Sequence, residues 1–294
     1  MLFLGVDGGG TRCRARLETA DGQVLGHGLA GPASMRFGLE AALGSVMSAT
    51  RQTLQEAGLA EEALANVYAG IGLAGTGQRG ARAALEAWRH PFAGAWFEGD
   101  GYLALLGAFG EGDGGIVIAG TGSIALTHYK GRTKRIGGYG FPVSDEGSGA
   151  DLGLNAIRHS LRTLDGRAAS SEFSADVLAR FAHDPAALIA WMETATATDY
   201  AALAPLVARH AQAKDTAARA LMHQAGSQIA GLVESLFASG VKQVALTGGL
   251  ADVLKTYLPS AIANRLSTPL ADAISGGVFL AKKRASLSTP RSEG

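Results

Sequence analysis

Residues 2–11 read LFLGVDGGGT, an apolar run that meets an aspartate and then three glycines. The apolar part predicts a buried strand over 2–6. Residues 12–19 alternate between apolar and charged side chains, which is typical of a half-exposed strand. The Asp-Gly pair at 21–22 is a hairpin signal before a returning strand over 23–29. The chain therefore opens as a three-stranded meander with a glycine loop at its first bend.

Strand and helix patterns alternate beyond this meander. Apolar residues at helical spacing predict a helix over 38–57 that stops at Gly58. The patterns that follow predict strands over 66–73 and 95–98, and helices over 78–89 and 101–109. Such an alternation is typical of an α/β layer architecture.

A second meander begins near residue 115 and repeats the first in its architecture. Its expected strands are 115–119, 124–129 and 132–136, and its small-residue loop, 120–123, again lies between the first two strands. We infer two lobes related by duplication. The remaining expectations are helices over most of 150–240, a strand over 241–246, a helix over about 271–284 and a polar, frayed tail over 286–294.

Three loops of glycine and hydroxyl residues follow three buried strands. Glycine lets a backbone come close to a phosphate and turn its N–H groups toward it, and hydroxyls add neutral donors. One such turn is usually structural, but three in repeated settings favour a phosphate site. No P-loop lysine motif occurs, and no G-x-G-x-x-G opens a helix. The candidate residues of the three loops are Gly9, Gly10 and Thr11; Gly120, Thr121, Gly122 and Ser123; and Gly248 and Gly249.

Charged residues near these loops receive separate interpretations. Asp7 ends the first strand, and a carboxylate there favours a phosphate only with Mg²⁺ between them, directly or through water. We therefore expect Asp7 at a magnesium site. The arginines at 12, 14 and 16 are expected on a solvated strand face, and the three tryptophans in core or interface. None of the seven histidines has a zinc-like spacing with a carboxylate, so we expect them at the surface or at strand edges.

Composition excludes several classes of function. The 294 residues are 47% apolar and 18% charged with zero formal net charge, so no electrostatic argument favours a nucleic acid or an anionic membrane as partner. Cys13 is the single cysteine, which rules out an internal disulfide or an iron–sulfur cluster held within the chain. No apolar stretch of membrane-spanning length occurs, and the N-terminus lacks a basic region before its apolar run. We expect a cytoplasmic protein.

The glycine loops also carry a family resemblance. Residues 7–11, 119–123 and 246–251 resemble the two phosphate motifs and the adenosine motif of the actin-like sugar kinase superfamily. The segments 136–140 and 144–149 are similar to those of its branch with N-acetylglucosamine kinases, bacterial glucosamine kinases and dehydratase ATPase activators. His-Pro-Phe at 90–92 and the short chain most resemble the glucosamine kinases, whereas the single cysteine sets the iron–sulfur activators aside.

This resemblance implies roles for individual residues. Asp100 corresponds to the catalytic aspartate, which takes the proton from the acceptor hydroxyl; the alternative is an N-cap for helix 101–109. Asp145 corresponds to a residue that recognises sugar hydroxyls, and the alternative is a solvated turn before a helix over 149–161. Ser34 takes the place of a sugar-binding asparagine and offers no amide, which leaves the exact sugar open. The sugar-contacting residues so implied are Ser34, Asp100, Thr121, Gly138 and Asp145.

The expected fold is α/β, with two actin-like (ribonuclease H-like) lobes around a nucleotide-binding cleft. The first lobe spans 1–110, with a C-terminal helix at 271–285 packed back on it, and the second spans 111–270 with a helical insertion. The resemblance implies ATP and Mg²⁺ as cofactors, a homodimer, and phosphorylation of an amino sugar, with glucosamine giving glucosamine 6-phosphate. N-acetylglucosamine as the acceptor, and a non-catalytic nucleotide or sugar sensor, are the alternatives.

Overall fold

The computed structural model describes residues 1–288. The chain divides into two compact units, one of Met1–Asp113 with Thr268–Gly294 and one of Gly114–Ser267. Of the polar tail expected at 286–294, the first three residues complete the last helix, and 289–294 lie outside the described residues.

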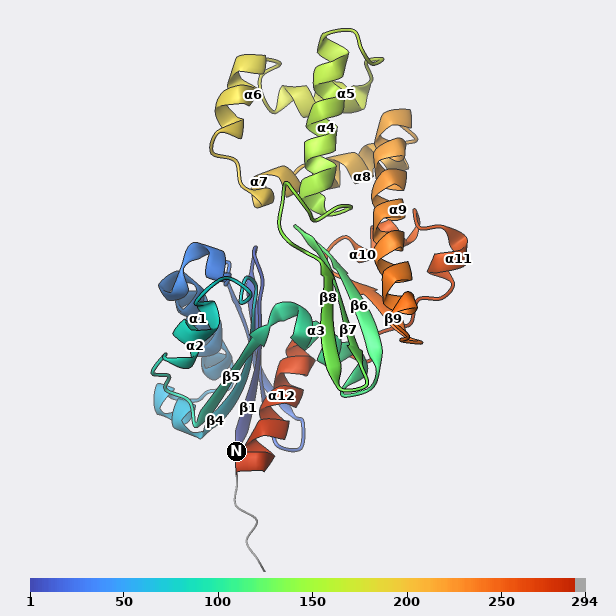
Figure 1. Cartoon of the computed structure of the whole chain (residues 1–294). Coiled ribbons are helices and arrows are strands. Elements are labelled where there is room, and N and C mark those ends of the chain that lie inside the picture. Colours follow the sequence, from blue (N-terminus) through green and yellow to red (C-terminus); the bar gives the residue numbers. More distant parts are fainter. Residues whose placement is uncertain (289–294) are drawn as a thin grey trace, which may run out of the picture. The chain divides into compact units, whose positions relative to one another are not determined.

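The first unit is built on a five-stranded mixed sheet (Figure 1). Strands β1 and β2, and β2 and β3, pair antiparallel, so the predicted meander is confirmed. Strands β4 and β5 then extend the sheet parallel to β1, which gives the order β3-β2-β1-β4-β5. The strands are β1 (Leu2–Gly8), β2 (Cys13–Thr19), β3 (Val24–Ala30), β4 (Val67–Leu73) and β5 (Gly94–Gly99).

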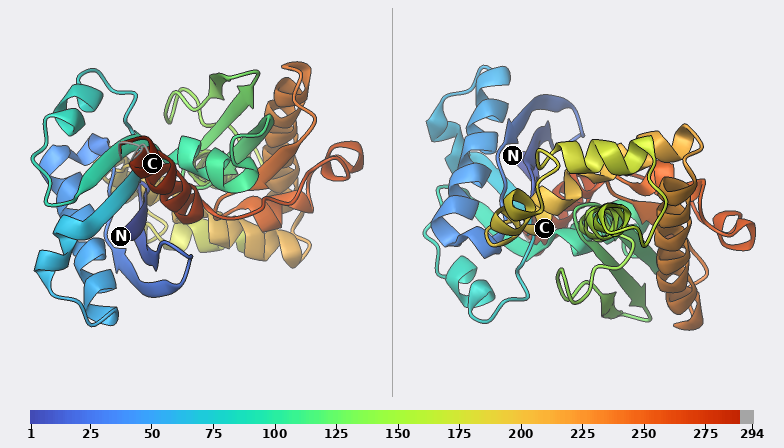
Figure 2. Two further views of the ribbon diagram at one scale, coloured as in Figure 1. Left: turned by 90° about the horizontal axis from the view of Figure 1, so that it is seen from below. Right: turned by 90° about the horizontal axis from the view of Figure 1, so that it is seen from above.

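Helices cover both faces of this sheet (Figures 1 and 2). Helix α1 packs against β2 and β3 on one face, and α12 packs against β1, β4 and α3 on the other. The contact with α12 is close enough to require glycine, because a β-carbon at Gly70 would collide with the carbonyl oxygen of Gly277. The helices are α1 (Leu39–Glu56), α2 (Ala81–Glu86), α3 (Asp100–Phe109) and α12 (Ala273–Ser288), with short 3₁₀ turns η1 (Met35–Phe37) and η2 (Glu61–Asn66).

The charged side of β2 differs from its prediction as a solvated face. Arg14 pairs with Asp7 at 2.6 Å, and Arg16 pairs with Glu18 at 2.7 Å and donates to the hydroxyl of Ser275 on α12 at 3.0 Å. The expectation is therefore wrong for Arg14 and Arg16. The sequence pattern shows alternation within β2 but does not show that a helix from the far end of the chain covers its polar side.

The second unit repeats the strand arrangement of the first. Its sheet has the order β8-β7-β6-β9, in which β6, β7 and β8 form an antiparallel meander and β9 pairs parallel to β6. The same order and directions relate β3-β2-β1-β4 in the first unit. The strands are β6 (Gly114–Ala119), β7 (Ser123–Tyr129), β8 (Arg132–Gly137) and β9 (Val244–Thr247).

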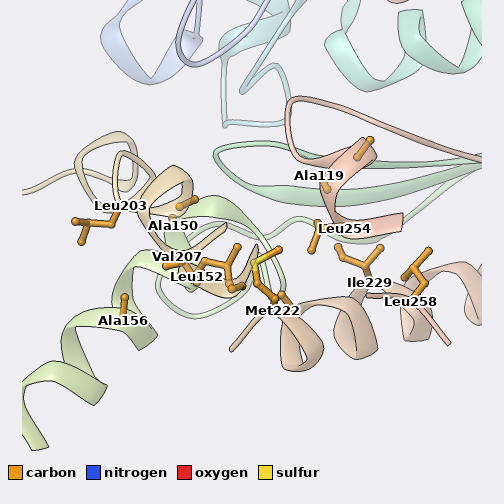
Figure 3. Packing of buried hydrophobic residues seen from close by; sticks show 14 of the residues in the cluster. Ala119, Ala150, Leu152, Ala156, Leu203, Val207, Met222, Ile229, Leu254 and Leu258 are labelled. Carbon is orange, nitrogen blue, oxygen red and sulfur yellow. The ribbon is translucent and has the colours of Figure 1, made fainter. Parts of the chain in front are cut away.

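Helices make up most of the remainder of this unit. Helix α9 packs against β6 and β7, and α4, α5, α7 and α8 pack among themselves. Their apolar side chains form one core that reaches the end of β6, where Ala119 lies (Figure 3). The helices are α4 (Gly149–Leu164), α5 (Glu172–Ala179), α6 (Pro185–Met192), α7 (Ala197–Ala201), α8 (Ala204–Gln212), α9 (Thr216–Ala238), α10 (Ala251–Lys255) and α11 (Ser260–Ala263).

Three histidines are buried or partly buried, which differs from the expectation of surface or strand-edge positions. His210 on α8 is 8% exposed, and its Nε2 lies 2.8 Å from a carboxylate oxygen of Asp176. His159 and His90 each have one buried ring nitrogen without a hydrogen-bond partner. Ring stacking explains part of this placement, because His159 and His210 both lie against Phe173. The tryptophans behave as predicted and pack against buried clusters.

Candidate active site

Three parallel strands of the first unit end at one edge of the sheet. Gly8 at the end of β1 pairs with Leu73 of β4, and Leu73 pairs with Gly99 of β5. Asp100 follows directly, and Asp7 is one residue before the end of β1. Because carboxyl ends of parallel strands share an edge, the strand register brings the loop after β1 and Asp100 to the same side of the unit.

The loop after β1 leaves its backbone accessible. The N–H of Gly9 donates to the carbonyl of Arg12 at 3.0 Å, which closes the turn, and Thr11 at its tip is exposed. A β-carbon at Gly10 would meet no protein atom within 4 Å, and one at Gly9 would come only to 3.5 Å from a carbonyl oxygen. The glycines here are therefore not demanded by protein packing, which fits a loop kept open for a ligand.

Asp100 is the first residue of α3, and the N-cap of this helix is Gly99. The alternative interpretation of Asp100 as the N-cap is therefore wrong. Its carboxylate accepts a hydrogen bond from the N–H of Gly101 at 2.9 Å. Burial raises the pKa of Asp100 to about 6, with a further upward contribution from the charge of Asp7 and an opposing one from the Gly101 hydrogen bond.

Asp7 is partly buried, with 19% of its side chain exposed, and it is held by the guanidinium of Arg14 at 2.6 Å. Among residues 1–288, no group of three or more histidine, cysteine, aspartate or glutamate side chains could hold a metal ion. Asp7 thus fits a metal that takes most of its ligands from phosphate and water, as Mg²⁺ commonly does. It does not fit an ion enclosed by protein ligands.

Ser34 lies close to the same edge but is buried, with 1% exposed. Its hydroxyl accepts from the N–H of Arg36 at 3.3 Å and lies 3.4 Å from the carbonyl oxygen of Ala74, so it caps a short 3₁₀ turn. A β-carbon at Gly75 would lie 3.4 Å from this hydroxyl and 3.3 Å from the amide nitrogen of Gln78. The amide of Gln78 therefore reaches the side of the loop that carries Ser34.

The loop after β4 was missed as a candidate in the sequence. Besides Gln78, it carries Thr76, whose hydroxyl would lie 3.3 Å from a β-carbon at Gly99, next to Asp100. The available signal was position, since this loop directly follows a predicted strand, as the recognised glycine loops do. Its parallel pairing with β1 was not visible in the sequence.

The second unit gathers its candidates around the end of β6. The N–H of Gly120 donates to the carbonyl of Gly122 at 2.9 Å, and a β-carbon at Gly120 would meet nothing within 4 Å. The N-terminus of α4 is tied to this loop, because Gly149 donates to the carbonyl of Gly120 at 2.8 Å and Ala150 donates to that of Thr121 at 3.1 Å. Ser123 is buried at the start of β7.

Asp145 lies directly against this loop. A β-carbon at Gly122 would be 2.5 Å from one carboxylate oxygen of Asp145, and the other oxygen accepts from the N–H of Gly140 at 3.1 Å. Asp145 is 9% exposed and has a left-handed backbone with φ of 69°, which is uncommon for a residue other than glycine. It is not the solvated turn residue of the alternative interpretation. Gly138 has φ of 68° and packs against Ile124.

The third loop, which follows β9, is hydrogen-bonded to the same end of β6. The N–H of Leu250 donates to the carbonyl of Ala119 at 3.0 Å, and Gly248, with φ of 101°, lies against the backbone of Ala119. Gly249 is exposed and would accommodate a β-carbon freely. Asp145 and the candidates from the second and third loops thus surround one strand end in the second unit, while Asp7, Gly9, Gly10, Thr11, Ser34 and Asp100 belong to the first.

A meander of three antiparallel strands extended by a parallel strand, present twice, is the actin-like fold. A ROK family glucokinase from Streptomyces griseus, solved with glucose and AMPPNP, has this fold with a TM-score of 0.59 at 17% identity and covers 96% of this chain and 99% of its own. A structure from Chromobacterium violaceum, named as a candidate N-acetylglucosamine kinase, matches with a TM-score of 0.90 and 36% identity over 96% of this chain and 98% of its own.

Residues 4–278 match the BadF/BadG/BcrA/BcrD ATPase family, and the chain belongs to that family. A glucosamine kinase of Vibrio cholerae is 34% identical over 281 residues, which is 96% of each chain. An N-acetylmuramic acid/N-acetylglucosamine kinase of Clostridium acetobutylicum is 30% identical over 183 residues, covering 60% of this chain and 58% of its own. None of the helices in residues 1–288 has the length and apolar character needed to cross a membrane.

Proposed function

We propose that this chain is an ATP-dependent kinase that phosphorylates an amino sugar, with glucosamine as the acceptor and glucosamine 6-phosphate as the product. The family is one of ATPases, and relatives that match the chain are named as kinases of glucosamine and of N-acetylglucosamine. The 6-hydroxyl as acceptor follows from the resemblance in the sequence motifs.

The main support for the proposal is the position and the burial of Asp100. It is a partly buried carboxyl at the edge where β1, β4 and β5 end, and burial brings its pKa to about 6. A general base is most effective when its pKa lies near the working pH, because it is then largely ionised and still a good proton acceptor. An open glycine loop and Asp7 share this edge.

Different residues have different roles in phosphoryl transfer and sugar binding. When bound, ATP supplies the phosphoryl group, and Mg²⁺ neutralises the charge that develops during its transfer. Asp100 accepts the proton of the sugar hydroxyl as this oxygen forms its bond to phosphorus. Asp145 accepts hydrogen bonds from other sugar hydroxyls, and Thr121, Gly138 and Ser34 shape the sugar site.

The remaining candidates hold the nucleotide and its metal. The backbone N–H groups of the glycine loops hold and orient the phosphates, with the hydroxyls of Thr11, Thr121 and Ser123 as additional donors. Asp7, oriented by Arg14, would hold the metal directly or through water. The nucleotide-binding residues in this proposal are Gly9, Gly10, Thr11, Gly120, Thr121, Gly122, Ser123, Gly248 and Gly249.

Glucosamine is preferred over its acetylated form on chemical grounds. A free 2-amino group is largely protonated near neutral pH, so its site should offer carboxylates or backbone carbonyls and little apolar volume. An acetamide requires an apolar niche for its methyl group and partners for its N–H and C=O. The Vibrio cholerae glucosamine kinase and the Chromobacterium violaceum structure named as a candidate N-acetylglucosamine kinase each align over 96% of this chain, so the choice of glucosamine rests on the sequence motifs and on this chemistry.

The test is the ratio of kcat/KM for glucosamine and N-acetylglucosamine, with glucose and mannosamine for comparison and with the phosphorylated carbon identified by NMR. We expect glucosamine to be preferred by about tenfold or more, because unpaired polar groups in the wrong complex cost roughly 1–3 kcal/mol each. A preference for N-acetylglucosamine would show that the proposed sugar is wrong, while the assignment as an amino-sugar kinase would still hold. Nucleotide binding without phosphorylation of any sugar would support the sensor alternative.

The cytoplasmic location and the homodimer are also proposals. A single buried cysteine suits a reducing compartment, where disulfides contribute nothing to stability. The dimer rests on the family resemblance, and sedimentation equilibrium of the purified chain tests it directly: a monomer at micromolar concentration would exclude it.

A further inference from the structure

Asp151 and Asn155 form a polar pair on one face of α4, one turn apart. The side-chain amide of Asn155 donates to a carboxylate oxygen of Asp151 at 2.8 Å and to its backbone carbonyl at 2.9 Å. Both residues are partly buried. One donation orients the carboxylate of Asp151, and the other holds the amide of Asn155 against the helix backbone.

The other carboxylate oxygen of Asp151 reaches out of the helix to the preceding loop. It accepts from the N–H of Gly147 at 3.0 Å, while the N–H of Asp151 itself donates to the Ser148 hydroxyl at 3.2 Å. Gly147 is buried, so without Asp151 its N–H would lose this partner in a place that water reaches poorly. The two hydrogen bonds join Asp151, in the first turn of α4, to the N-cap residue Ser148 and to the residue before it.

Gly147 lies two residues after Asp145, and the loop between them has little freedom. Ser148 donates to the carbonyl of Asp145 at 3.2 Å, and a β-carbon at Gly147 would lie 2.8 Å from a carbonyl of α9. The left-handed backbone of Asp145 is an unfavourable conformation that neighbouring contacts must maintain. The hydrogen bond from Gly147 to Asp151 is one of these contacts.

The same helix end is bonded to the loop after β6. Gly149 and Ala150 donate to the carbonyls of Gly120 and Thr121, and the hydroxyl of Ser123 donates to the carbonyl of Glu146 at 2.7 Å. The first turn of α4 thus carries two attachments, one to the phosphate loop through its backbone and one to the Asp145 loop through the side chain of Asp151. Removing the side chain would release only the second.

We propose that Asp151, held by Asn155, is a positioning residue that sets Asp145 against the phosphate loop, so that the sugar hydroxyl and the phosphates are held in register. This inference rests on the proposed function, because it assigns Asp145 to the sugar. Asp151 and Asn155 act through the loop 144–148 and not through contact with the substrate.

The experiment compares Asp151→Ala with Asp184→Ala in the kinase assay. Asp184 is a matched control, because its carboxylate accepts from the N–H of Ala186 at 2.8 Å at the start of α6. Misplacing a substrate-holding group by a fraction of an ångström to an ångström is costly, so we expect the KM for the sugar to rise about tenfold or more in Asp151→Ala. The affinity for a non-hydrolysable ATP analogue, measured by calorimetry, should change less than about threefold, since the backbone bonds to Gly120 and Thr121 remain. Asp184→Ala should change neither.

A second variant covers the case in which Asp151→Ala does not fold. Asn155→Ala keeps the carboxylate but frees its orientation, and we expect a rise of about threefold in the sugar KM. Because Asn155 acts only through Asp151, the double variant should be no worse than Asp151→Ala alone.

Three results would overturn the inference: sugar KM values in Asp151→Ala equal to those of Asp184→Ala, equal losses of sugar and nucleotide affinity, or full additivity in the double variant. If the unmodified chain phosphorylates no sugar, the proposed function fails instead, and the two failures are distinguishable.

Discussion

At the scale of single residues, Asp100 should impose a pH dependence on catalysis. Its pKa of about 6 means that the base is lost as the pH falls through that value. We expect kcat/KM to fall about tenfold per pH unit well below pH 6 and to level off above it. N-acetylglucosamine, whose nitrogen does not titrate in this range, serves as a slow reference substrate. A profile flat down to pH 5 with both sugars would contradict this role.

Replacing Asp100 with asparagine should lower the turnover but raise the stability of the fold near neutral pH. We expect turnover to fall by roughly 10²–10⁴, because the amide cannot accept the proton. The folded-state pKa is raised from its ordinary 3.8, so the folded chain binds the proton more tightly than the unfolded chain. Ionised Asp100 therefore destabilises the fold above about pH 6, and this cost disappears below about pH 4. At pH 7.5 the variant should be more stable by about 1–3 kcal/mol, an order-of-magnitude figure.

The comparison is made by chemical denaturation at pH 7.5 and pH 4, with turnover measured in parallel. Retention of more than about a third of the turnover would remove Asp100 from the base role, since a positioned acid–base group contributes at least about a hundredfold. A stability difference that does not shrink toward pH 4 would point instead to altered packing.

Gly120→Ala tests the loop after β6 without disturbing the fold. A β-carbon there meets no protein atom within 4 Å, so thermal stability should stay close to that of the wild type. It would nevertheless stand where a phosphate has to approach the backbone, and we expect nucleotide affinity to fall by about tenfold or more, with sugar affinity less affected. If calorimetry showed unchanged nucleotide affinity, the loop after β6 would be a turn without a role in nucleotide binding.

At the scale of elements, the contact of α12 with the first sheet depends on glycine. Gly70→Ala should destabilise the chain by about 1–3 kcal/mol or more, because its β-carbon would collide with the backbone of Gly277. Gly44→Ala, in the exposed middle of α1 with nothing near its β-carbon, is the matched control and should stabilise by about 0.5–1 kcal/mol. Equal melting temperatures for the two variants would contradict this close packing.

Most elements could be predicted from apolar periodicity, and the errors have local causes. The helix expected over 78–89 is shorter, Ala81–Glu86, and it starts late because Gly80 before it has a left-handed backbone with φ of 82°. The last helix begins at Ala273, where the carboxylate of Asp272 accepts from the N–H of Ser275 at 2.9 Å. The strand expected over 241–246 is Val244–Thr247, aligned by its pairing with β6.

The candidate site was less predictable than the elements. Glycine loops after apolar strands are visible in sequence, because their composition reports the backbone they need. Thr76, Gln78 and Asp151 were not visible, since their relevance depends on which strands pair and which loop a helix end touches. The burial of Ser34 and of Asp145 likewise follows from contacts between segments distant in sequence.

At the scale of the whole molecule, duplication explains why the recognisable loops occur in corresponding places. The strand order β3-β2-β1-β4 recurs as β8-β7-β6-β9, and each copy places an open glycine loop after its first strand. The remainder of each unit differs, with α12 covering one sheet and a large group of helices following the other. Each copy thus supplies an open glycine loop and a carboxylate near it, Asp7 in the first unit and Asp145 in the second.

The central claim is that ATP turnover by this chain is coupled to an amino sugar. The most direct measurement is the amount of ADP released against the amount of sugar phosphate formed, with ATP and Mg²⁺ in the presence and absence of glucosamine. We expect one sugar phosphate for each ADP, negligible ADP release without sugar, and loss of both products in Asp100→Asn. ADP release that is independent of sugar, or that persists in Asp100→Asn without sugar phosphate, would contradict it.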